Sequence, residues 1–301
     1  MSKTDAIIRR AAEKGLVVPA FNAPYLPMVE PIVRAIVDQD CFALVETARP
    51  EWIKFEAHSA AAVMKEYQKW AQPDYMAIHL DHVPVIDEDL QRVDYVEIIQ
   101  EALDMGFESV MVDGSRLPLE ENIAATREIV ERAQKKGVPV EAELGAVMGH
   151  EAGPLPPYEE LFASGKGFTD VEEARRFARE SGCSWLSVAV GNIHGAISGA
   201  ARDQRKVEAR LNLDRLAQLR AATNLPLVLH GGSGINRDNV LAAIKQGIAK
   251  INIGAEIRLA YEEALRASGS VAKAQDACYD RTTWVIRDYF GISGDRMQLV
   301  A

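Results

Sequence analysis

Eight short apolar runs, separated by longer amphipathic segments, are the feature that most constrains the fold of this chain. The runs are rich in β-branched residues, which favours strands, and the segments between them repeat apolar residues at helical spacing. The predicted strands cover residues 17–22, 42–47, 75–80, 107–113, 138–144, 184–190, 226–230 and 249–254. Parallel strands that are buried on both faces read as nearly continuous apolar runs. This order therefore predicts an α/β fold, a (β/α)8 TIM barrel.

The predicted barrel takes up most of the chain. We expect a single domain over residues 1–301, with a barrel core at about 15–265 and extra C-terminal helices at about 266–301. An open doubly wound sheet would need a glycine-rich turn after its first strand, where this chain reads FNAPYLP. Two intervals, 145–170 and 191–212, are longer than a βα unit requires and both follow strands. We expect them to be functional loops at the catalytic end of the barrel.

The composition disfavours several classes of protein. A net charge of −10 argues against a nucleic-acid surface. No apolar run reaches the length of a membrane span, and the N-terminus lacks the apolar core of a signal peptide. Cys41, Cys183 and Cys278 form no CxxC pair, so neither a disulfide framework nor a thiolate zinc site is indicated. We expect a cytoplasmic protein that binds a small molecule.

Each predicted strand ends in a polar residue that can bind a metal or hydrogen-bond a substrate. In a TIM barrel the active site is built from the C-terminal ends of the strands. A lone histidine there is more often a satisfied polar residue, but four of the chain's six histidines converge at this end. The strand-end residues are Asn22, Glu46, His79, Asp81, His82, Asp113, Glu143, Asn192, His194, His230 and Asn252.

Histidines from separate strands could hold a divalent, zinc-like cation with positions left for substrate oxygens. In the stretch HLDH (79–82), side chains alternate if the strand is still extended, so His79 and Asp81 would face one way and His82 the other. Asp81 is then a candidate base, because a carboxylate beside a metal-bound ketone can remove a proton. The alternative for Asp81 is to cap the next turn.

Two glycine-containing segments predict a phosphate site. HGGSG (230–234) follows a predicted strand and precedes a helix, so its backbone N–H groups could surround an anion. KINIG (250–254) belongs to the neighbouring strand. Phosphate sites in barrels typically lie between the loops after the seventh and eighth strands, which is where these two segments fall.

From PAFN near residue 19 to KINIGAEIR near residue 258, the chain resembles the class II metal-dependent ketose-bisphosphate aldolases, which act on fructose 1,6-bisphosphate or tagatose 1,6-bisphosphate. The motifs HLDH, GFESVMVDGS, ENIAATREIV, VEAELG, VGNIHG, LVLHGGSG and KINIG occur in family order. The resemblance implies a carbon–carbon lyase of the aldehyde-lyase class that cleaves or forms a ketose (bis)phosphate through a metal-stabilised enediolate. The products would be dihydroxyacetone phosphate, or a similar ketone, and an aldehyde. A homodimer or homotetramer is also implied.

The resemblance further implies roles for individual residues. The implied Zn²⁺ ligands are His82, His194 and His230, with Asp113 and Glu143 at a second or alternate metal position; a monovalent cation is another option. Asp81 would be the acid/base at the aldehyde end of the cleaved bond, and Glu151 a loop carboxylate linked to proton exchange on the ketone fragment. With the strand-end residues included, the predicted substrate or phosphate contacts are Asn22, Glu46, Arg49, His79, Gly195, Gly231, Gly232, Ser233, Asn252, Ile253, Gly254 and Ala255.

The chain departs from the family pattern on the phosphate side. Ala255 stands where a threonine hydroxyl usually bonds phosphate, and an acidic Glu46 would repel a phosphate unless Arg49 compensates. Two alternatives therefore stay open. One is a metal-dependent aldolase or epimerase acting on a non-phosphorylated sugar or sugar acid, and the other is a non-catalytic relative that binds metal or sugar phosphate. A Schiff-base mechanism is disfavoured, because Lys250 begins its strand and is expected on the other face.

Overall fold

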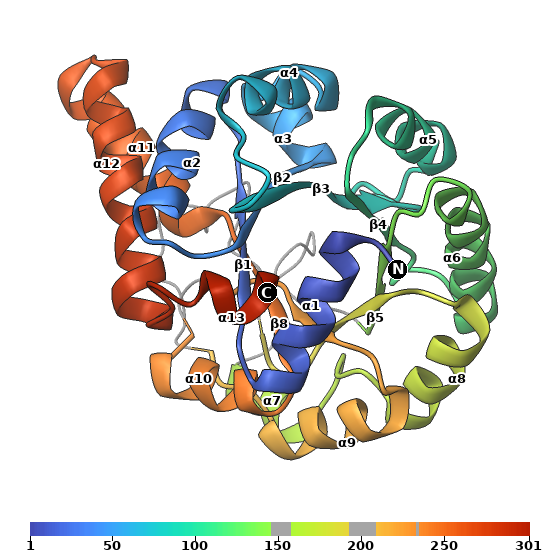
Figure 1. Cartoon of the computed structure of the whole chain (residues 1–301). Coiled ribbons are helices and arrows are strands. Elements are labelled where there is room, and N and C mark those ends of the chain that lie inside the picture. The colour runs from blue at the N-terminus through green and yellow to red at the C-terminus, as the bar shows by residue number, and fades with distance from the viewer. Residues whose placement is uncertain (146–157, 193–208, 233–234) are drawn as a thin grey trace.

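Eight parallel strands hydrogen-bond in sequence order and close into a barrel, as the sequence predicted (Figure 1). The computed structural model describes residues 1–145, 158–192, 209–232 and 235–301. The strands are β1 (Val18–Asn22), β2 (Ala43–Ala48), β3 (Met76–Pro84), β4 (Ser109–Asp113), β5 (Val140–Leu144), β6 (Trp185–Val188), β7 (Leu227–Leu229) and β8 (Ile248–Ile253). Each overlaps the run predicted for it, and β3 continues past its predicted end at residue 80.

Helices connect the successive strands around the outside of the barrel, and further helices precede β1 and follow β8 (Figure 1). They are α1 (Lys3–Lys14), α2 (Val29–Asp38), α3 (Arg49–Lys54), α4 (Ala60–Trp70), α5 (Tyr95–Met105), α6 (Leu119–Gln134), α7 (Tyr158–Ser164), α8 (Val171–Ser181), α9 (Leu213–Thr223), α10 (Arg237–Lys245), α11 (Ala255–Ser268), α12 (Val271–Trp284) and α13 (Arg296–Val300). A 3₁₀ helix, η1 (Leu26–Met28), precedes α2, and a π-helix, η2 (Val285–Phe290), follows α12.

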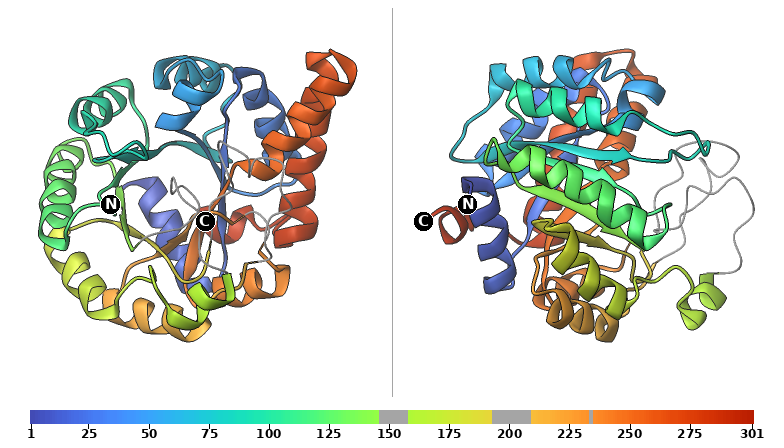
Figure 2. Two further views of the ribbon diagram at one scale, coloured as in Figure 1. Left: turned by 180° about the vertical axis from the view of Figure 1, so that it is seen from behind. Right: turned by 90° about the vertical axis from the view of Figure 1, so that its right-hand side faces the viewer.

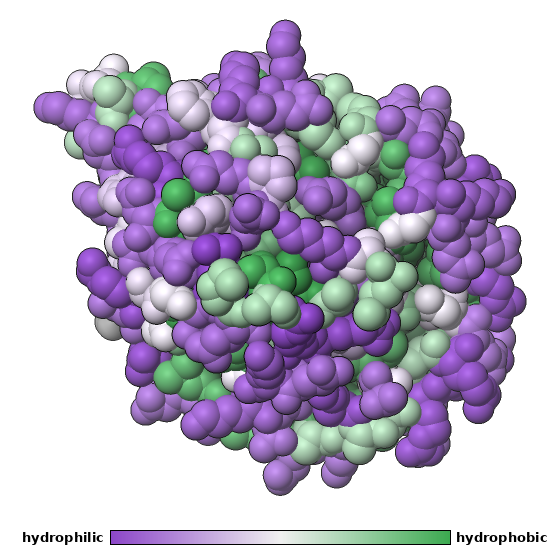
Figure 3. Space-filling model, in the orientation of Figure 1, coloured by the Kyte–Doolittle hydropathy of each residue, from purple (hydrophilic) through white to green (hydrophobic). Residues whose placement is uncertain are grey.

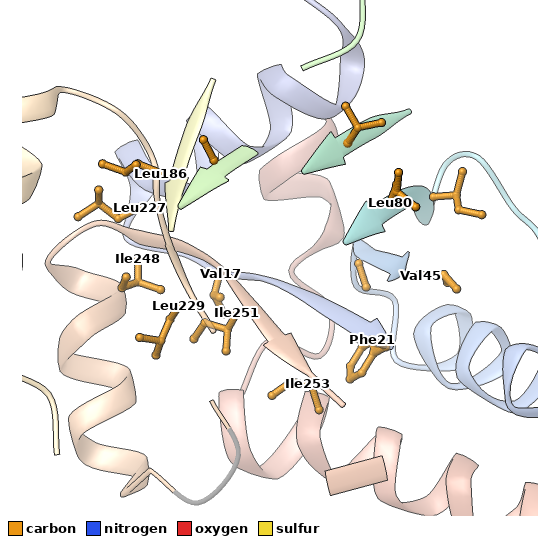
Figure 4. Packing of buried hydrophobic residues seen from close by; sticks show 14 of the residues in the cluster. Val17, Phe21, Val45, Leu80, Leu186, Leu227, Leu229, Ile248, Ile251 and Ile253 are labelled. Carbon is orange, nitrogen blue, oxygen red and sulfur yellow. The ribbon is translucent and has the colours of Figure 1, made fainter. Parts of the chain in front are cut away.

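The main hydrophobic core lies between the strands and the helices. Leu80 of β3 and Ile253 of β8 are both buried in it (Figure 4). Successive side chains of a strand face opposite ways. Asp81 and Asn252, the sequence neighbours of these two residues, are buried outside this core and hydrogen-bond each other. Along each of these strands, one set of alternate side chains therefore packs against the helices, while the other set faces the interior of the barrel.

The N-terminal helix closes the barrel at the end where the strands begin. Ile7, Ile8 and Ala11 of α1 pack in a second buried cluster with Trp185 of β6 and Leu299 of α13. Figure 2 shows α1 and α13 together at one end of the barrel. Apolar side chains fill this end of the barrel. The polar side chains that surround Asp81 lie toward the opposite end, where the strands finish.

The C-terminal helices pack beside the barrel. α12 packs against α2 and α11, and its far end extends beyond the barrel (Figure 1). α13 then returns to α1. Cys41, Cys183 and Cys278 are all buried free thiols. On the face shown in Figure 3, hydrophilic residues predominate and apolar ones form small groups. In the described parts of the chain, every helix is too short or too polar to cross a membrane.

Candidate active site

Asp81 lies in a cluster of polar side chains where the strands end, and it is only 4% exposed. Two amides hold its carboxyl group: Asn252 Nδ2 donates to Oδ1 at 2.8 Å, and Asn22 Nδ2 donates to Oδ2 at 3.2 Å. Burial alone would raise the pKa of Asp81, but nearby charge, that of Lys250 first, holds it below its ordinary value. Both oxygens therefore act as acceptors in an oriented, ionised carboxylate.

His82 does not follow the alternation of an extended strand. Its backbone has φ of 46°, in the left-handed region that non-glycine residues seldom adopt. The pairing of β3 with β4 also shifts between Leu80 and Val83. The expectation that His82 faces away from Asp81 depended on an extended strand and does not hold. The turned backbone instead brings the His82 ring to within 5.5 Å of the His230 ring, measured between centroids.

Two carboxylates flank His230. Its Nε2 lies 2.8 Å from Glu141 Oε1, and its Nδ1 lies 3.3 Å from Glu143 Oε2. If Nε2–H donates to Glu141, the lone pair of Nδ1 faces the carboxyl group of Glu143. A cation between these two groups would bind both and remove the repulsion between their lone pairs. Burial, together with nearby Asp113, raises the pKa of Glu143 to about 7.

The residues present fit a metal ion. One ligand atom from each of His82, Glu143 and His230 can be chosen so that all lie within 4.8 Å of one another. Two imidazoles and a carboxylate form a donor set of the type that catalytic zinc uses. Asp113 Oδ2 is 2.8 Å from His82 Nε2. Burial alone would lower the pKa of His82, but Asp113 raises it to about 10. The predicted ligand His194 lies outside the described residues.

Glu46 and His79 lie beneath this cluster, and both are completely buried. His79 Nδ1 is 2.8 Å from Ser109 Oγ, and Glu46 Oε2 is 3.3 Å from Lys250 Nζ. Burial and the charge of Lys250 lower the pKa of His79 to about 3, so the imidazole is neutral at physiological pH. Both residues were predicted to contact substrate. In the structure their side chains lie in the interior of the barrel, where Glu46 faces Lys250 and His79 faces Ser109.

Glu141 and Lys250 are site residues that the sequence reasoning missed. Lys250 was expected on the other face, but its ammonium points into the barrel, 3.0 Å from Glu141 Oε2. The signal that could have found them is spacing. Glu141 stands two residues before Glu143, and Lys250 two residues before Asn252, so each pair shares one face of its strand.

The predicted phosphate side is described in part. After β7, Gly231 has φ of +66°, and a Cβ on Gly232 would lie 2.6 Å from Ile251 Cγ2, so both positions favour glycine. α11 begins at Ala255 after Gly254, and no side chain of a described residue caps it. Ile253 is buried in the main core, so only its backbone could reach a substrate.

Arg49 begins α3, and its Nη1 lies 3.3 Å from Asp87 Oδ2. Beside it, Glu51 is buried and accepts the N–H of Ala48 at 3.1 Å. The remaining predicted residues that lie outside the described parts of the chain are Glu151, Gly195 and Ser233.

Comparison with known proteins agrees with this geometry. The family profile "Fructose-bisphosphate aldolase class-II" matches residues 2–292. The chain is similar to fructose-bisphosphate aldolases of Streptococcus pneumoniae serotype 4, with 32% identity over 283 residues, and of Streptococcus pyogenes serotype M1, with 32% over 280; each match covers 92% of this chain and 86% of the relative. It is also similar to the crystal structure of the YdjI aldolase from Escherichia coli K12, with a TM-score of 0.76, 27% identity, and 97% and 98% of the two chains covered. The chain therefore belongs to the class II fructose-bisphosphate aldolase family.

Proposed function

We propose that this protein is a zinc-dependent aldolase that cleaves or forms a ketose phosphate, releasing dihydroxyacetone phosphate or a similar ketone and an aldehyde. The observation that carries the proposal is the position of the Asp81 carboxylate next to the donor set of His82, Glu143 and His230. The relatives that bear the name fructose-bisphosphate aldolase support the same reaction class. The proposal also includes a cytoplasmic location and a homodimer or homotetramer, on family resemblance alone.

The metal would be held by His82, His230 and Glu143, with His194 of the VGNIHG motif as a further ligand and Asp113 supporting the His82 ring. A bound zinc ion supplies positive charge beside the substrate carbonyl and so lowers the cost of the negative charge that develops there. The Glu141 carboxylate holds the ring of His230 from behind.

Asp81 would move the proton in the carbon–carbon bond cleavage. Its carboxylate accepts the proton of the hydroxyl group that becomes the aldehyde oxygen, and the electron pair of the broken bond stays with the ketone fragment. Asn22 and Asn252 hold the carboxylate in place while the proton transfers. In the condensation direction the same group returns the proton. We assign proton exchange on the ketone fragment to Glu151, following the family motif. Lys250 is buried and paired with Glu141 as a charged ammonium, so its own amine is not available for a Schiff base.

The phosphate would bind between the loops after β7 and β8. Supporting features are the backbone of Gly231 and Gly232, the segment from Asn252 to Ala255, and the N-terminus of the 14-residue helix α11, which no described side chain caps. Gly195 and Ser233 are proposed as further contacts. A non-phosphorylated sugar acid is the second candidate substrate class. It is favoured by Ala255, which offers no side-chain hydroxyl to a phosphate.

The test combines metal removal with a substrate panel. The metal-stripped protein should lose turnover, and added zinc should restore it. An Asp81→Ala variant should bind zinc normally and lose about 10²–10⁴-fold in kcat. The panel compares ketose bisphosphates, ketose monophosphates, unphosphorylated ketoses and sugar acids. Turnover that persists in excess chelator would contradict the metal mechanism, and turnover of sugar acids alone would favour the second candidate.

A further inference from the structure

Lys250 is a fully buried lysine to which the proposed reaction assigns no step. It lies in β8 two residues before Asn252, and both side chains face the barrel interior. Burial of an ammonium group is costly unless the group is paired and hydrogen-bonded. The partners of Lys250 therefore indicate what this residue does for the site.

Lys250 fixes the orientation of the Asn252 amide. Its Nζ donates to Asn252 Oδ1 at 2.6 Å. An ammonium group can only donate, so the amide oxygen must face it and Nδ2 must point elsewhere. That Nδ2 donates to Asp81 Oδ1 at 2.8 Å. The lysine thus determines which end of the amide meets the proposed base.

Glu141 connects the same ammonium group to His230. Glu141 Oε2 is 3.0 Å from Lys250 Nζ, and Oε1 is 2.8 Å from His230 Nε2. A carboxylate behind a ligating histidine fixes the ring and its tautomer, which leaves the other nitrogen for the metal. In His230 that other nitrogen is Nδ1, which faces Glu143.

Glu46 places a second buried carboxyl group beside Lys250, and burial together with the charge of Asp81 raises the pKa of Glu46 well above its ordinary value. Its Oε2 is 3.3 Å from Nζ, and neither of its carboxylate oxygens has a hydrogen-bond partner in the described parts of the chain. Burial would lower the pKa of Lys250, but Glu141 and Glu46 raise it above the ordinary value, so the lysine stays charged. The contacts of Lys250 with Asn252 and Glu141 do not involve Glu46, so Glu46→Gln should leave both of them intact.

We propose that Lys250 is a positioning residue that orients the base Asp81 through Asn252 and the metal ligand His230 through Glu141. The inference rests on the proposed aldolase function, and it adds a residue that aligns both halves of the site without touching substrate or metal. Removing Lys250 would then impair proton transfer and metal binding together.

The experiment compares Lys250→Met, which keeps a long side chain without charge, with Lys250→Arg, Glu46→Gln and the double variant Lys250→Met/Glu46→Gln. The measurements are kcat, KM, zinc affinity by competition with a chelator, and thermal unfolding of the metal-free protein. Lys250→Met should lower kcat about 10–100-fold with KM within about threefold. It should also weaken zinc binding by about tenfold. Lys250→Arg, which keeps a cationic donor, should recover part of both.

The double variant separates positioning from simple charge balance. Removing the buried Glu46 carboxyl group together with the lysine should bring the melting temperature back toward that of Glu46→Gln, because one acidic group fewer is left buried without its cationic neighbour. Its kcat and zinc affinity should remain as low as in Lys250→Met. Full recovery of both in the double variant would overturn the inference, as would a folded Lys250→Met protein with wild-type kcat and zinc affinity. If Lys250→Met cannot be purified, the double variant against Glu46→Gln gives the same comparison.

Failure of this inference can be told apart from failure of the proposed function. If the zinc-loaded wild-type protein turns over no sugar in the panel, the proposed function fails, and zinc affinity still tests the contact of Lys250 with Glu141. If the wild type is active and Lys250→Met matches it in kcat and zinc affinity, only the positioning role fails.

Discussion

His82 Nε2 lies 2.8 Å from Asp113 Oδ2, and this contact joins a β3 histidine whose own backbone is left-handed to the end of the neighbouring strand β4. Asp113 Oδ1 also accepts the backbone N–H of Ser115 at 2.8 Å. Burial would raise the pKa of Asp113, but His82 holds it well below its usual range. Asp113 therefore supports the ring of a proposed metal ligand as an ionised carboxylate.

Asp113→Asn should weaken zinc binding by about 10–100-fold, because a neutral amide holds the His82 ring less firmly than a carboxylate does. Competition with a chelator of known affinity measures the change. Ser115→Ala is the milder comparison: it removes the side-chain hydrogen bond of Ser115 to Asp113 but keeps the backbone one and the carboxylate itself, so zinc affinity should fall less than in Asp113→Asn. Wild-type affinity in Asp113→Asn would contradict the supporting role.

Asn22→Ala should lower kcat/KM by about 10–100-fold, because a hydrogen bond to a charged group contributes about 1.5–3 kcal/mol. The bond lost is the one from Asn22 Nδ2 to Asp81 Oδ2. Asn22→Asp, which replaces the donor with a second carboxylate, should lose more through repulsion of Asp81. Steady-state kinetics with the best substrate of the panel tests this order, and an Asn22→Asp variant more active than Asn22→Ala would reverse it.

Glu51 should make stability fall as the pH rises. Burial, with a contribution from nearby Asp81, raises the pKa of Glu51 from the ordinary 4.5 to about 8. Between these values the folded state holds a proton that the unfolded state releases, so the contribution of Glu51 to stability is full below about pH 4.5 and is lost progressively up to about pH 8. Glu51→Gln removes this dependence, and the free energy of unfolding of the variant relative to wild type should rise by up to about 1.4 kcal/mol per pH unit in the window. Urea unfolding at several pH values measures it. The exposed Glu101→Gln serves as the control and should show no such trend.

Asp5→Ala should destabilise the protein without changing kcat. Trp185 Nε1 donates to Asp5 Oδ1 at 3.0 Å where α1 closes the barrel, far from the end that carries Asp81. Loss of the acceptor leaves a buried indole N–H unpaired, at a cost of about 1–3 kcal/mol. Asp5→Asn keeps an acceptor oxygen and should retain most of the stability. Denaturant unfolding together with kinetics checks both statements, and a fall in kcat at full zinc loading would show that the two ends of the barrel are coupled.

The order and type of the strands could be predicted from the sequence, because burial on both faces leaves a periodicity that one chain displays by itself. The same pattern placed Asp81, His82 and His230 at the carboxyl ends of their strands, since that edge of a barrel gathers residues from every strand. The structure brings all three together. The residues of the proposed metal site were therefore named from the sequence, whereas Asn22 and Asn252 were predicted as substrate contacts and the structure instead has their amides hydrogen-bonded to Asp81.

The tertiary structure decided how those residues face one another. The positive φ of His82 overrides strand alternation and turns its ring toward His230, and no local pattern in HLDH announces that turn. Lys250 reads as an ordinary lysine near the start of a strand, yet closing the barrel places it between Glu46 and Glu141, which come from two other strands. Such charge pairs depend on contacts between residues far apart in the chain. Periodicity therefore determines which side chains enter the barrel, and only the closed sheet determines which of them meet.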